Sequence, residues 1–483
     1  MDIDLNFIKL ETYSSASMYN MFLNMIVRFF ICVSFLAGFA TLGLGQSYYW
    51  VGQAIEVSKT PRYCSKWLAA CSYELTEEEA TALGLCSRDE VLQFTPLATA
   101  PDAKSLSFAL EQIEAQFMLD LGITGKGVKI GVIDGGFLKA PESPPLRHLF
   151  ENDLIAHYKD YITPELPGYG GSGHLDDQHG TGVLNMIGGM DPASQIQFGL
   201  ATGATFYLAR TDHGAYEKRL EEDLLIEALE EMEKQGVRLV NISLGYAKGY
   251  NNADENYTPE DIDGSSMIAR AVDHAFFAKN MLVVVAAGNE GNDIKWRVLS
   301  TPGDARGALT VGATKLKVWD RMDYSSIGPE FLDYTKPDIS CYSSYGTSYA
   351  TPVITGLAAC VMELYPDLSV RTIKEALISA GNLYPYGNNH LGQGVPQISR
   401  LLKILKGEEV IRPERVSPTK NIFEVNASKG SIMAVYHKKD TSRVMVREIS
   451  KIKGNSARIK REKDADFTTL LIGKKAVEID WPD

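Results

Sequence analysis

The sequence predicts an α/β fold in which a mainly parallel sheet is preceded by a small α+β unit and followed by a small all-β domain. Between residues 120 and 405, apolar runs of strand length alternate with amphipathic stretches of helix length, a pattern typical of a parallel sheet covered on both faces. After residue 420, short stretches alternate between apolar and polar residues, as half-buried strands do. The 483 residues, 45% of them hydrophobic, are enough for two or three domains with a large core.

An apolar stretch lies close to the start of the chain. Residues 29–40 are almost entirely apolar, Arg28 precedes them, and the small residues Gly43 and Gly45 follow. This pattern is typical of a secretory signal peptide, which we predict over residues 1–45. An uncleaved membrane anchor is the alternative, but the apolar core is short for a span, so no stable span is expected after cleavage. The predicted location is outside the cell or in the cell envelope, including the periplasm.

Residues 46–104 are predicted to form the small α+β unit. A strand is expected over 48–57, a helix over 76–83 after a Thr that can cap it, and a return strand over 91–94.

The central region, residues 105–411, is predicted to hold the parallel sheet. Residues 105–120 place their apolar side chains at helical spacing and predict a helix. The further helices are expected at 180–189, 217–235, 265–279, 347–364 and 370–380, and the strands at 128–133, 204–209, 237–243, 281–286 and 308–313.

Residues 412–483 are predicted to form the all-β domain, with a charged, Pro-containing linker over 412–418. Turn residues separate the alternating stretches, which are expected to be strands at 421–426, 431–437, 443–450, 456–460, 467–472 and 475–480.

Charge and cysteine content restrict the possible functions. The net charge is −13, yet residues 412–483 carry 16 Lys and Arg against 10 Asp and Glu, so the rest of the chain is strongly acidic. An acidic body argues against nucleic acid as a partner. No Cys/His spacing resembles a zinc site.

Six cysteines are present, and removal of the predicted signal peptide leaves five, so at least one is free. We expect Cys360 to be a buried thiol in a helix. Cys341, which precedes Ser348 by seven residues, is expected to lie near a cleft. One bridge is possible within a group of three whose pairing the sequence leaves open: Cys64, Cys71 and Cys86.

Ser348 lies in the run Gly-Thr-Ser-Tyr-Ala-Thr-Pro, directly before an apolar helical stretch. A glycine permits a sharp turn into the helix, and the first free N–H groups of that helix then lie beside the hydroxyl, where they can hold an oxyanion. An ordinary helix-capping serine is the alternative for this motif taken alone.

A serine nucleophile needs a general base and a group that orients it. His179 lies in Asp-Gln-His-Gly-Thr-Gly, where two glycines clear the space around the ring. Asp134 ends an apolar run that reads as a buried parallel strand, the place where α/β folds carry their sites. Asn289 follows another such run and can donate a side-chain N–H to an oxyanion.

Together these segments resemble the subtilisin-like serine proteases, the subtilases, whose triad has the chain order Asp, His, Ser. Asp134, His179 and Ser348 follow that order, and Asn289 lies between the last two. The resemblance covers about residues 120–405 and implies a three-layer subtilisin-like domain that needs no cofactor and acts on proteins or peptides.

The resemblance also implies two walls of a pocket that binds the substrate side chain before the cleaved bond. One wall is Ser243-Leu244-Gly245, whose strand would also pair with the substrate backbone. The other is Ala286-Ala287-Gly288. Glu290 lies beside this pocket in sequence, and its charge favours basic residues there.

The flanking regions take roles by the same resemblance. Residues 46–104 occupy the place of a propeptide that assists folding, inhibits the enzyme and is then removed, although the unit is short for one, so a retained domain is the alternative. Residues 412–483 correspond to tails that serve attachment to the cell surface, sorting or substrate binding in secreted bacterial proteases.

Four residues depart from the family pattern without removing a catalytic group. Gly135 replaces a usual Ser or Thr, Gly182 a common second His, Tyr349 a common Met, and Thr351 a common Ala. Tyr349 is expected to narrow or repack the cleft beside the nucleophile.

Two other functions use the same residues. A fold kept only as an inactive binding scaffold would not need all four catalytic groups, and a ligase or cyclase would pass the acyl group to an amine instead of water. A calcium ion bound through Asp254, Glu255 and Asp261 is a further hypothesis, but no regular calcium-loop spacing supports it, so a solvated loop is the simpler interpretation.

Overall fold

The computed structural model describes residues 47–52, 63–65, 70–75, 105–166, 168–169, 175–213, 218, 220–250 and 256–482. The predicted signal peptide, the helix at 76–83 and the strand at 91–94 lie outside these residues. The chain divides into two units, Met1–Thr99 and Ala100–Asp483.

The first unit contains a three-stranded antiparallel sheet with the order β1-β3-β2. Its strands are β1 (Ser47–Gly52), β2 (Tyr63–Ser65) and β3 (Ala70–Leu75). The register of β2 and β3 places Cys64 opposite Cys71.

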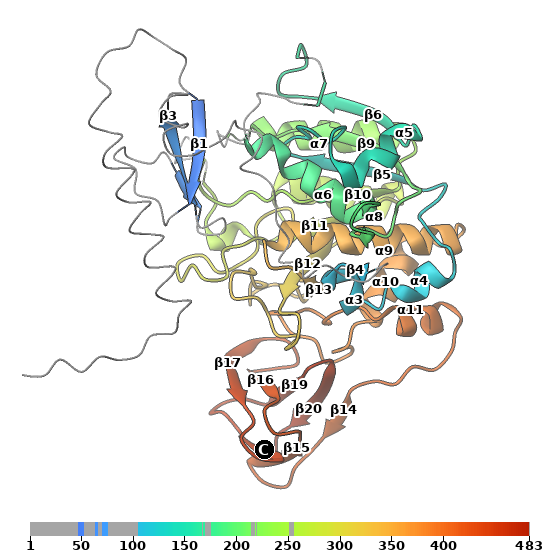
Figure 1. Ribbon diagram of the computed structural model, residues 1–483. Helices are drawn as coiled ribbons and strands as arrows, with labels where there is room; N and C mark the ends of the chain where they lie inside the picture. Colours follow the sequence, from blue (N-terminus) through green and yellow to red (C-terminus); the bar gives the residue numbers. More distant parts are fainter. Residues whose placement is uncertain are drawn as a thin grey trace, which may run out of the picture. The chain divides into compact units, whose positions relative to one another are not determined.

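The second unit is built on a seven-stranded sheet with the order β13-β12-β11-β10-β5-β9-β6 (Figure 1). Every neighbouring pair is parallel, as the alternation of apolar runs and helices predicts. The strands are β5 (Lys129–Asp134), β6 (Ile155–Asp160), β9 (Thr205–Arg210), β10 (Leu239–Ile242), β11 (Leu282–Ala286), β12 (Leu309–Thr314) and β13 (Ile339–Tyr342).

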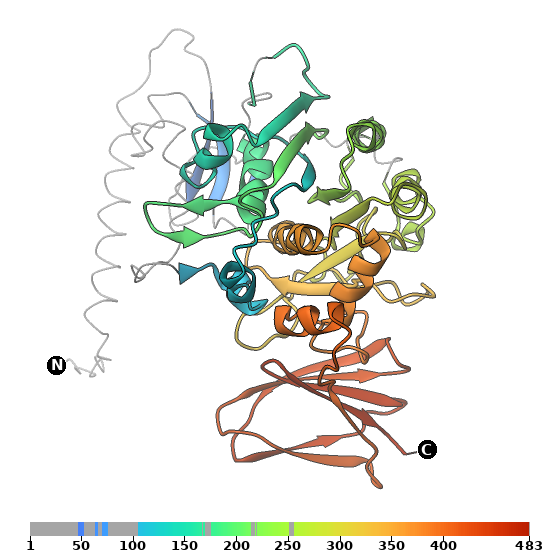
Figure 2. The same cartoon turned by 90° about the vertical axis from the view of Figure 1, so that its right-hand side faces the viewer.

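Helices cover both faces of this sheet, as the α/β prediction requires (Figure 2). Alternate residues of one strand face opposite sides: Val132 of β5 joins the larger core cluster and Ile133 the smaller one. The smaller cluster contains α7 (Leu220–Lys234) and α8 (Met267–Lys279). The larger contains α3 (Phe108–Gln112), α4 (Gln116–Asp120), α5 (Arg147–Glu151), α6 (His179–Gly188), α9 (Thr351–Leu364), α10 (Val370–Ser379) and α11 (Ile398–Leu405).

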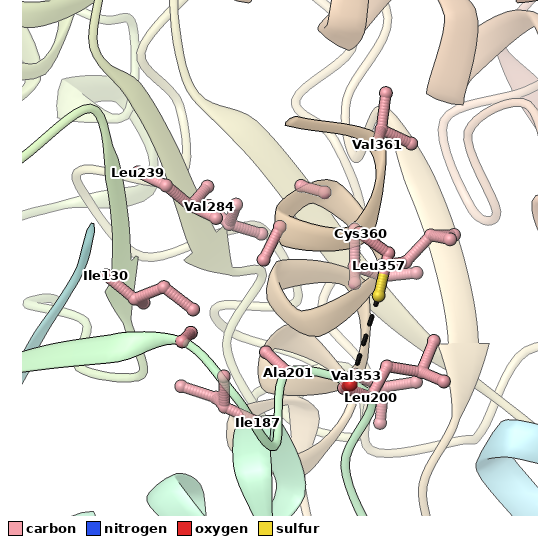
Figure 3. Packing of buried hydrophobic residues seen from close by; sticks show 14 of the residues in the cluster. Ile130, Ile187, Leu200, Ala201, Leu239, Val284, Val353, Leu357, Cys360 and Val361 are labelled. Atoms are coloured by element: carbon pink, nitrogen blue, oxygen red, sulfur yellow. Dashed lines mark hydrogen bonds between the residues drawn. The ribbon is translucent and has the colours of Figure 1, made fainter. Parts of the chain in front are cut away.

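Helix α9 runs through the larger core, and its buried face explains its apolar sequence. Leu357 and Val361 lie among side chains of the sheet and of the segment that follows α6 (Figure 3). Cys360 is a free, buried thiol, as predicted, and its Sγ lies 3.9 Å from the carbonyl oxygen of Leu200. Cys341 is also free, but it lies in β13 within this core and not at a cleft, and burial raises its pKa to about 12.

The single helix predicted over 105–120 is wrong. The segment forms β4 (Ser105–Leu106), α3 and α4, with a break at Glu114, whose φ of 64° lies in the left-handed region. The carboxylate of Glu114 accepts bonds from the N–H and hydroxyl of Ser399, which hold the break in place. Strand β4 pairs with β8 (Ile196–Gln197), which pairs with β7 (Met190–Asp191).

The C-terminal region is all-β, as predicted. A five-stranded sheet of order β14-β20-β19-β16-β17 packs against the pair β15-β18 through one apolar cluster. Strand β14 lies in the predicted linker and pairs with β20, and the other strands lie within one residue of their predicted bounds. The strands are β14 (Glu414–Val416), β15 (Ile422–Asn426), β16 (Ile432–Lys438), β17 (Val444–Lys451), β18 (Ser456–Lys460), β19 (Phe467–Ile472) and β20 (Lys475–Asp480).

Four short 3-10 turns complete the described part of the second unit: η1 (Pro144–Leu146), η2 (Leu175–Gln178), η4 (Pro259–Asp261) and η5 (Thr347–Tyr349). Within the residues that the structure describes, no helix combines the length and apolar character needed to cross a membrane.

Candidate active site

The predicted site residues gather at one edge of the seven-stranded sheet. Asp134 ends β5, Ser243 follows β10, and Asn289 follows β11 by three residues. Because these strands are parallel, their carboxyl ends lie at the same edge, where α/β proteins build their sites.

Asp134 and His179 are in direct contact. The Oδ1 atom of Asp134 lies 2.6 Å from Nδ1 of His179 and also accepts the N–H of Gly135 at 2.8 Å. Asp134 is fully buried, whereas 31% of the His179 side chain is exposed. A carboxylate at this position holds the ring proton on Nδ1, which makes Nε2 the basic nitrogen. The pair can therefore accept a proton at Nε2 of His179.

Gly135, where the family usually has Ser or Thr, affects the bonding of the second carboxylate oxygen of Asp134. Oδ2 of Asp134 is buried and has no hydrogen-bond partner among the described residues. Gly135 replaces a Ser or Thr and has no side chain to supply one. The orientation of the carboxylate thus rests on its Oδ1 bonds.

Glycines let the loops that carry this pair approach closely. A Cβ on Gly180 would lie 2.5 Å from the carbonyl oxygen of Gly136 and 2.9 Å from Cβ of Asp134. A Cβ on Gly136 would lie 2.7 Å from the carbonyl oxygen of Asp177. Side chains at these positions would push His179 away from Asp134.

Two other departures from the family pattern, Gly182 and Tyr349, complement each other. A Cβ on Gly182 would lie 2.9 Å from both Cε1 and the hydroxyl oxygen of Tyr349. The centroids of the Tyr349 and His179 rings are 5.7 Å apart. The tyrosine ring, whose pKa is raised by burial, thus fills the space that a larger residue at 182 would need and packs beside the histidine.

Ser348 is buried in the turn η5, which begins after Gly346 with a φ of 103°. Its hydroxyl donates to the carbonyl of Ser243 at 3.1 Å, and the hydroxyl of Ser243 donates to the carbonyl of Ser348 at 2.9 Å. The amide of Asn241 donates to the Ser243 hydroxyl, and Thr355 of α9 donates to Asn241. This buried chain fastens the serine turn to the end of β10.

Asn289 contacts the same turn. Its Oδ1 accepts the backbone N–H of Thr347 at 2.9 Å and the Thr347 hydroxyl at 3.2 Å. Because a backbone N–H only donates, the oxygen branch of the amide is identified, and the NH2 branch is directed away from Thr347. The NH2 group of Asn289 can therefore donate hydrogen bonds beside Ser348. Thr347, which orients it, had no distinguishing signal in the sequence.

The two predicted pocket walls meet at a residue that sequence reasoning missed. A Cβ on Gly245 would collide with Oγ of Ser300, and one on Gly288 would lie 3.0 Å from the same atom. Ser300 is 3% exposed, so its hydroxyl lies between the walls. Leu244 is partly buried against the smaller core, and Ala286 and Ala287 are buried. Nothing in the run Leu-Ser-Thr-Pro around Ser300 indicates this role.

The carboxylate of Glu290 is engaged with the protein itself. It accepts the backbone N–H of Asn289 at 2.8 Å and the hydroxyl of Ser326 at 3.1 Å, while the N–H of Glu290 donates to that hydroxyl at 3.0 Å. Burial raises its pKa despite these bonds. Glu290 thus ties the Asn289 loop to the segment that contains Ser326.

A buried guanidinium supports the loops of the Asp134–His179 pair. Arg210, 1% exposed, donates through Nε to the carbonyl of Gly135 at 3.0 Å and through Nη2 to Asp177 at 3.0 Å. Its Nη1 lies 3.1 Å from Oδ2 of Asp160. Burial opposes ionisation of Asp160, but N–H bonds from residues 162 and 163 and the charge of Arg210 keep its pKa low. No motif in the sequence indicates this network.

The calcium hypothesis gains no support. Asp254 and Glu255 lie outside the described residues, and Asp261 accepts bonds from the N–H and hydroxyl of Thr258. Within the described ranges, no group of three or more His, Cys, Asp or Glu side chains is placed to hold a metal ion.

Comparison with known proteins identifies the family of this chain. The sequence profile described as "Subtilase family" matches residues 125–394, more than half of the chain. Subtilisin DY of Bacillus licheniformis is 26% identical over 303 residues, which cover 59% of this chain and 96% of the relative. M-protease of Shouchella clausii is 26% identical over 330 residues, 66% of this chain and 76% of the relative.

Among solved structures, the CspB protease of Clostridium perfringens has the same fold, with a TM-score of 0.50 and 15% identity over 63% of this chain and 99% of that one. The family profile and the fold together identify the chain as a member of the subtilase family and a serine-type endopeptidase.

Proposed function

We propose that the protein is a secreted endopeptidase in which Ser348 is the nucleophile, His179 the general base and Asp134 the residue that orients the histidine. The observation that carries this assignment is the 2.6 Å contact between Nδ1 of His179 and the buried carboxylate of Asp134. A histidine held in this way has Nε2 as its basic nitrogen, on the side of the ring away from the carboxylate.

In the proposed reaction, Oγ of Ser348 attacks the substrate carbonyl while His179 takes its proton. The hydroxyl must first leave its bond to the carbonyl of Ser243, which a rotation about χ1 achieves. His179 then donates the proton to the leaving amine, and water hydrolyses the acyl-enzyme by the same steps. Asp134 stabilises the imidazolium that forms in each half of the reaction.

The NH2 group of Asn289 and the backbone N–H of Ser348 are the proposed oxyanion donors. The bonds from Thr347 to Oδ1 fix the amide before substrate arrives, so no reorganisation is needed as the charge develops. Each such donor contributes about 100- to 1,000-fold to kcat.

The substrates we propose are extended peptide segments of proteins. Residues 243–245 and 286–288 would form the pocket walls, and the Ser300 hydroxyl between them would restrict the pocket to small or polar side chains. The carboxylate of Glu290 bonds to its own loop, which weakens the expected preference for basic side chains.

The direct test compares Ser348→Ala with the matched variant Ser428→Ala, which changes an exposed serine of the C-terminal region. We expect Ser348→Ala to lose at least about 10⁴-fold in kcat on a chromogenic peptide with an unchanged unfolding temperature. Ser428→Ala should stay within about twofold of wild type. Undiminished hydrolysis in Ser348→Ala would overturn the assignment.

Secretion and self-maturation complete the proposal. Their support is the signal-peptide pattern over residues 1–45 and the propeptide-like position of residues 46–104. Intact mass of a chain expressed from Gln46 should show loss of a fragment of roughly the size of 46–104 in wild type but not in Ser348→Ala. An intact wild-type chain that still hydrolyses peptides would make this unit a retained domain.

A further inference from the structure

A cavity of about 280 Å³ lies between the segment after β12 and the C-terminal strand β17. The segment contributes Arg321, Ile327 and Glu330, and β17 contributes Val444 and Arg447, to its lining. One water occupies about 30 Å³ of liquid, so the cavity admits a small ion with several waters. Arg297 and His390 also line it, which gives it three guanidinium groups and an imidazole.

Arg321 is a buried cation with incomplete partners. It is 4% exposed, and its Nη1 donates to the backbone carbonyls of Asp323 and Ser325. Its Nε is buried without a hydrogen-bond partner among the described residues. Burial lowers the pKa of this guanidinium to about 10, and the charge of Arg447 acts in the same direction. A buried cation in this position is costly unless an acceptor faces it.

His390 is the second buried polar side chain in the lining of the cavity. It is 4% exposed, and its Nδ1 has no hydrogen-bond partner within the described part of the chain. Burial, followed by the charges of Arg321, Arg447 and Arg297, lowers its pKa well below the usual value. A neutral imidazole can donate one N–H to an oxygen atom.

The nearby carboxylates are already engaged. Asp320 accepts from the hydroxyl of Tyr436 and from Nε of Arg447 at 2.9 Å, and its Oδ2 lies 3.1 Å from Nζ of Lys315. Asp323 lies 2.9 Å from Nη2 of Arg447. The carboxylate in the cavity lining belongs to the exposed Glu330. The lining therefore carries more positive charge than its own carboxylates neutralise.

We propose that this cavity binds a tetrahedral oxyanion of the phosphate or sulfate class. Such an ion would accept from Nε of Arg321 and Nδ1 of His390 while Arg297 closes the exposed side. Planar guanidinium groups match oxyanion oxygens in charge and geometry. The bound ion would stabilise the contact between the C-terminal region and the segment after β12, whose Ser326 bonds to Glu290.

The test measures thermal unfolding and titration calorimetry of the full chain carrying Ser348→Ala, which prevents self-digestion. Inorganic phosphate and sulfate should raise the unfolding temperature with saturation, whereas sodium chloride at equal ionic strength should not. Equal effects of phosphate and chloride would overturn the site. Acetate binding as tightly as phosphate would overturn the assignment to tetrahedral ions.

Two further variants locate the site. Arg297→Gln removes an exposed cavity arginine and should weaken phosphate binding at least about tenfold. Arg371→Gln removes an exposed arginine of α10 that lies over the rings of Phe276 and Phe277, and should leave the affinity within about twofold. Unchanged affinity in Arg297→Gln would contradict the proposal.

Discussion

Two arginines in this molecule, Arg210 and Arg447, each pair with two aspartates and donate to a backbone carbonyl, but they do so in different regions. Arg210 pairs with Asp160 and Asp177 and donates to the carbonyl of Gly135, beside Asp134. Arg447 pairs with Asp320 and Asp323 and donates to the carbonyl of Arg321. These bonds join the C-terminal region to the segment after β12.

The difference lies in what each network holds. Arg210 bonds to the chain on both sides of the Asp134–His179 contact, because Asp177 precedes His179 by two residues. Arg447 bonds to the segment after β12 from strand β17. Buried ion pairs of this kind contribute little net stability, but removal of one partner leaves a costly buried charge. We therefore expect the first network to affect rate and stability, and the second to affect stability alone.

Arg210→Met gives the largest expected effect. Removal of the guanidinium leaves Asp160 and Asp177 buried without their cation, which should cost about 3–5 kcal/mol in the free energy of unfolding. Loss of the bonds to Gly135 and Asp177 should also lower kcat, by roughly tenfold, because 1 Å misplacements are costly at a reacting centre. Denaturant unfolding and steady-state kinetics measure the two effects. An unchanged kcat in a folded variant would remove the distinction between the networks.

Asn289→Ala removes a side chain that we propose to bond directly to the oxyanion, and its expected effect is the next largest in free energy. We expect kcat to fall about 100- to 1,000-fold with KM nearly unchanged, since the lost bond forms only in the transition state. Asn289 also accepts from Thr347, so Asn289→Asp, which keeps an acceptor but lacks the NH2 donor, serves as the control. Full activity in Asn289→Asp would show that the amide donor is not used.

Arg447→Met should lower stability without changing the rate. Arg447 is more exposed than Arg210, 14% against 1% of the side chain, so water can reach the groups it leaves. The expected loss is about 1–3 kcal/mol in the free energy of unfolding, with kcat within about twofold of wild type. A tenfold fall in kcat at a temperature where the variant is folded would show that the contact between the C-terminal region and the segment after β12 affects the active site.

Ser300→Gly has the smallest expected effect and separates binding from chemistry. Removal of the hydroxyl between the pocket walls should raise kcat/KM for a Leu over an Ala side chain at the cleaved bond by about tenfold, the effect of roughly one methylene group or more in a pocket. Paired peptide substrates measure this ratio. The ratio should be unaltered by Arg447→Met, and an unaltered ratio in Ser300→Gly would place the pocket elsewhere.

Five strands of the parallel sheet, β5, β9, β10, β11 and β12, were predictable because local apolar runs mark them, whereas the edge strands β6 and β13 were not predicted. Apolar runs mark β5, β10 and β11, and the polar residue that ends or follows each run falls at the carboxyl edge. Asp134 and His179 could be paired from sequence only through the family motif, since 45 residues separate them.

The supporting residues could not be predicted because their roles depend on contacts between distant segments. Arg210 directly follows the strand predicted over 204–209, and its partners Asp160 and Asp177 are 50 and 33 residues away. Ser300 matters only because Gly245 and Gly288 approach it. The break at Glu114 depends on Ser399, 285 residues later, so the helical periodicity of 105–120 gave no sign of it.

The most direct test of the proposed mechanism is labelling with a serine-reactive phosphonate followed by peptide mass spectrometry. We predict one label per chain on Ser348, formed at a normal rate in Arg447→Met and more slowly in Arg210→Met. A label on another serine, or no label in a preparation that still hydrolyses peptides, would contradict the assignment of Ser348 and of the network that supports it.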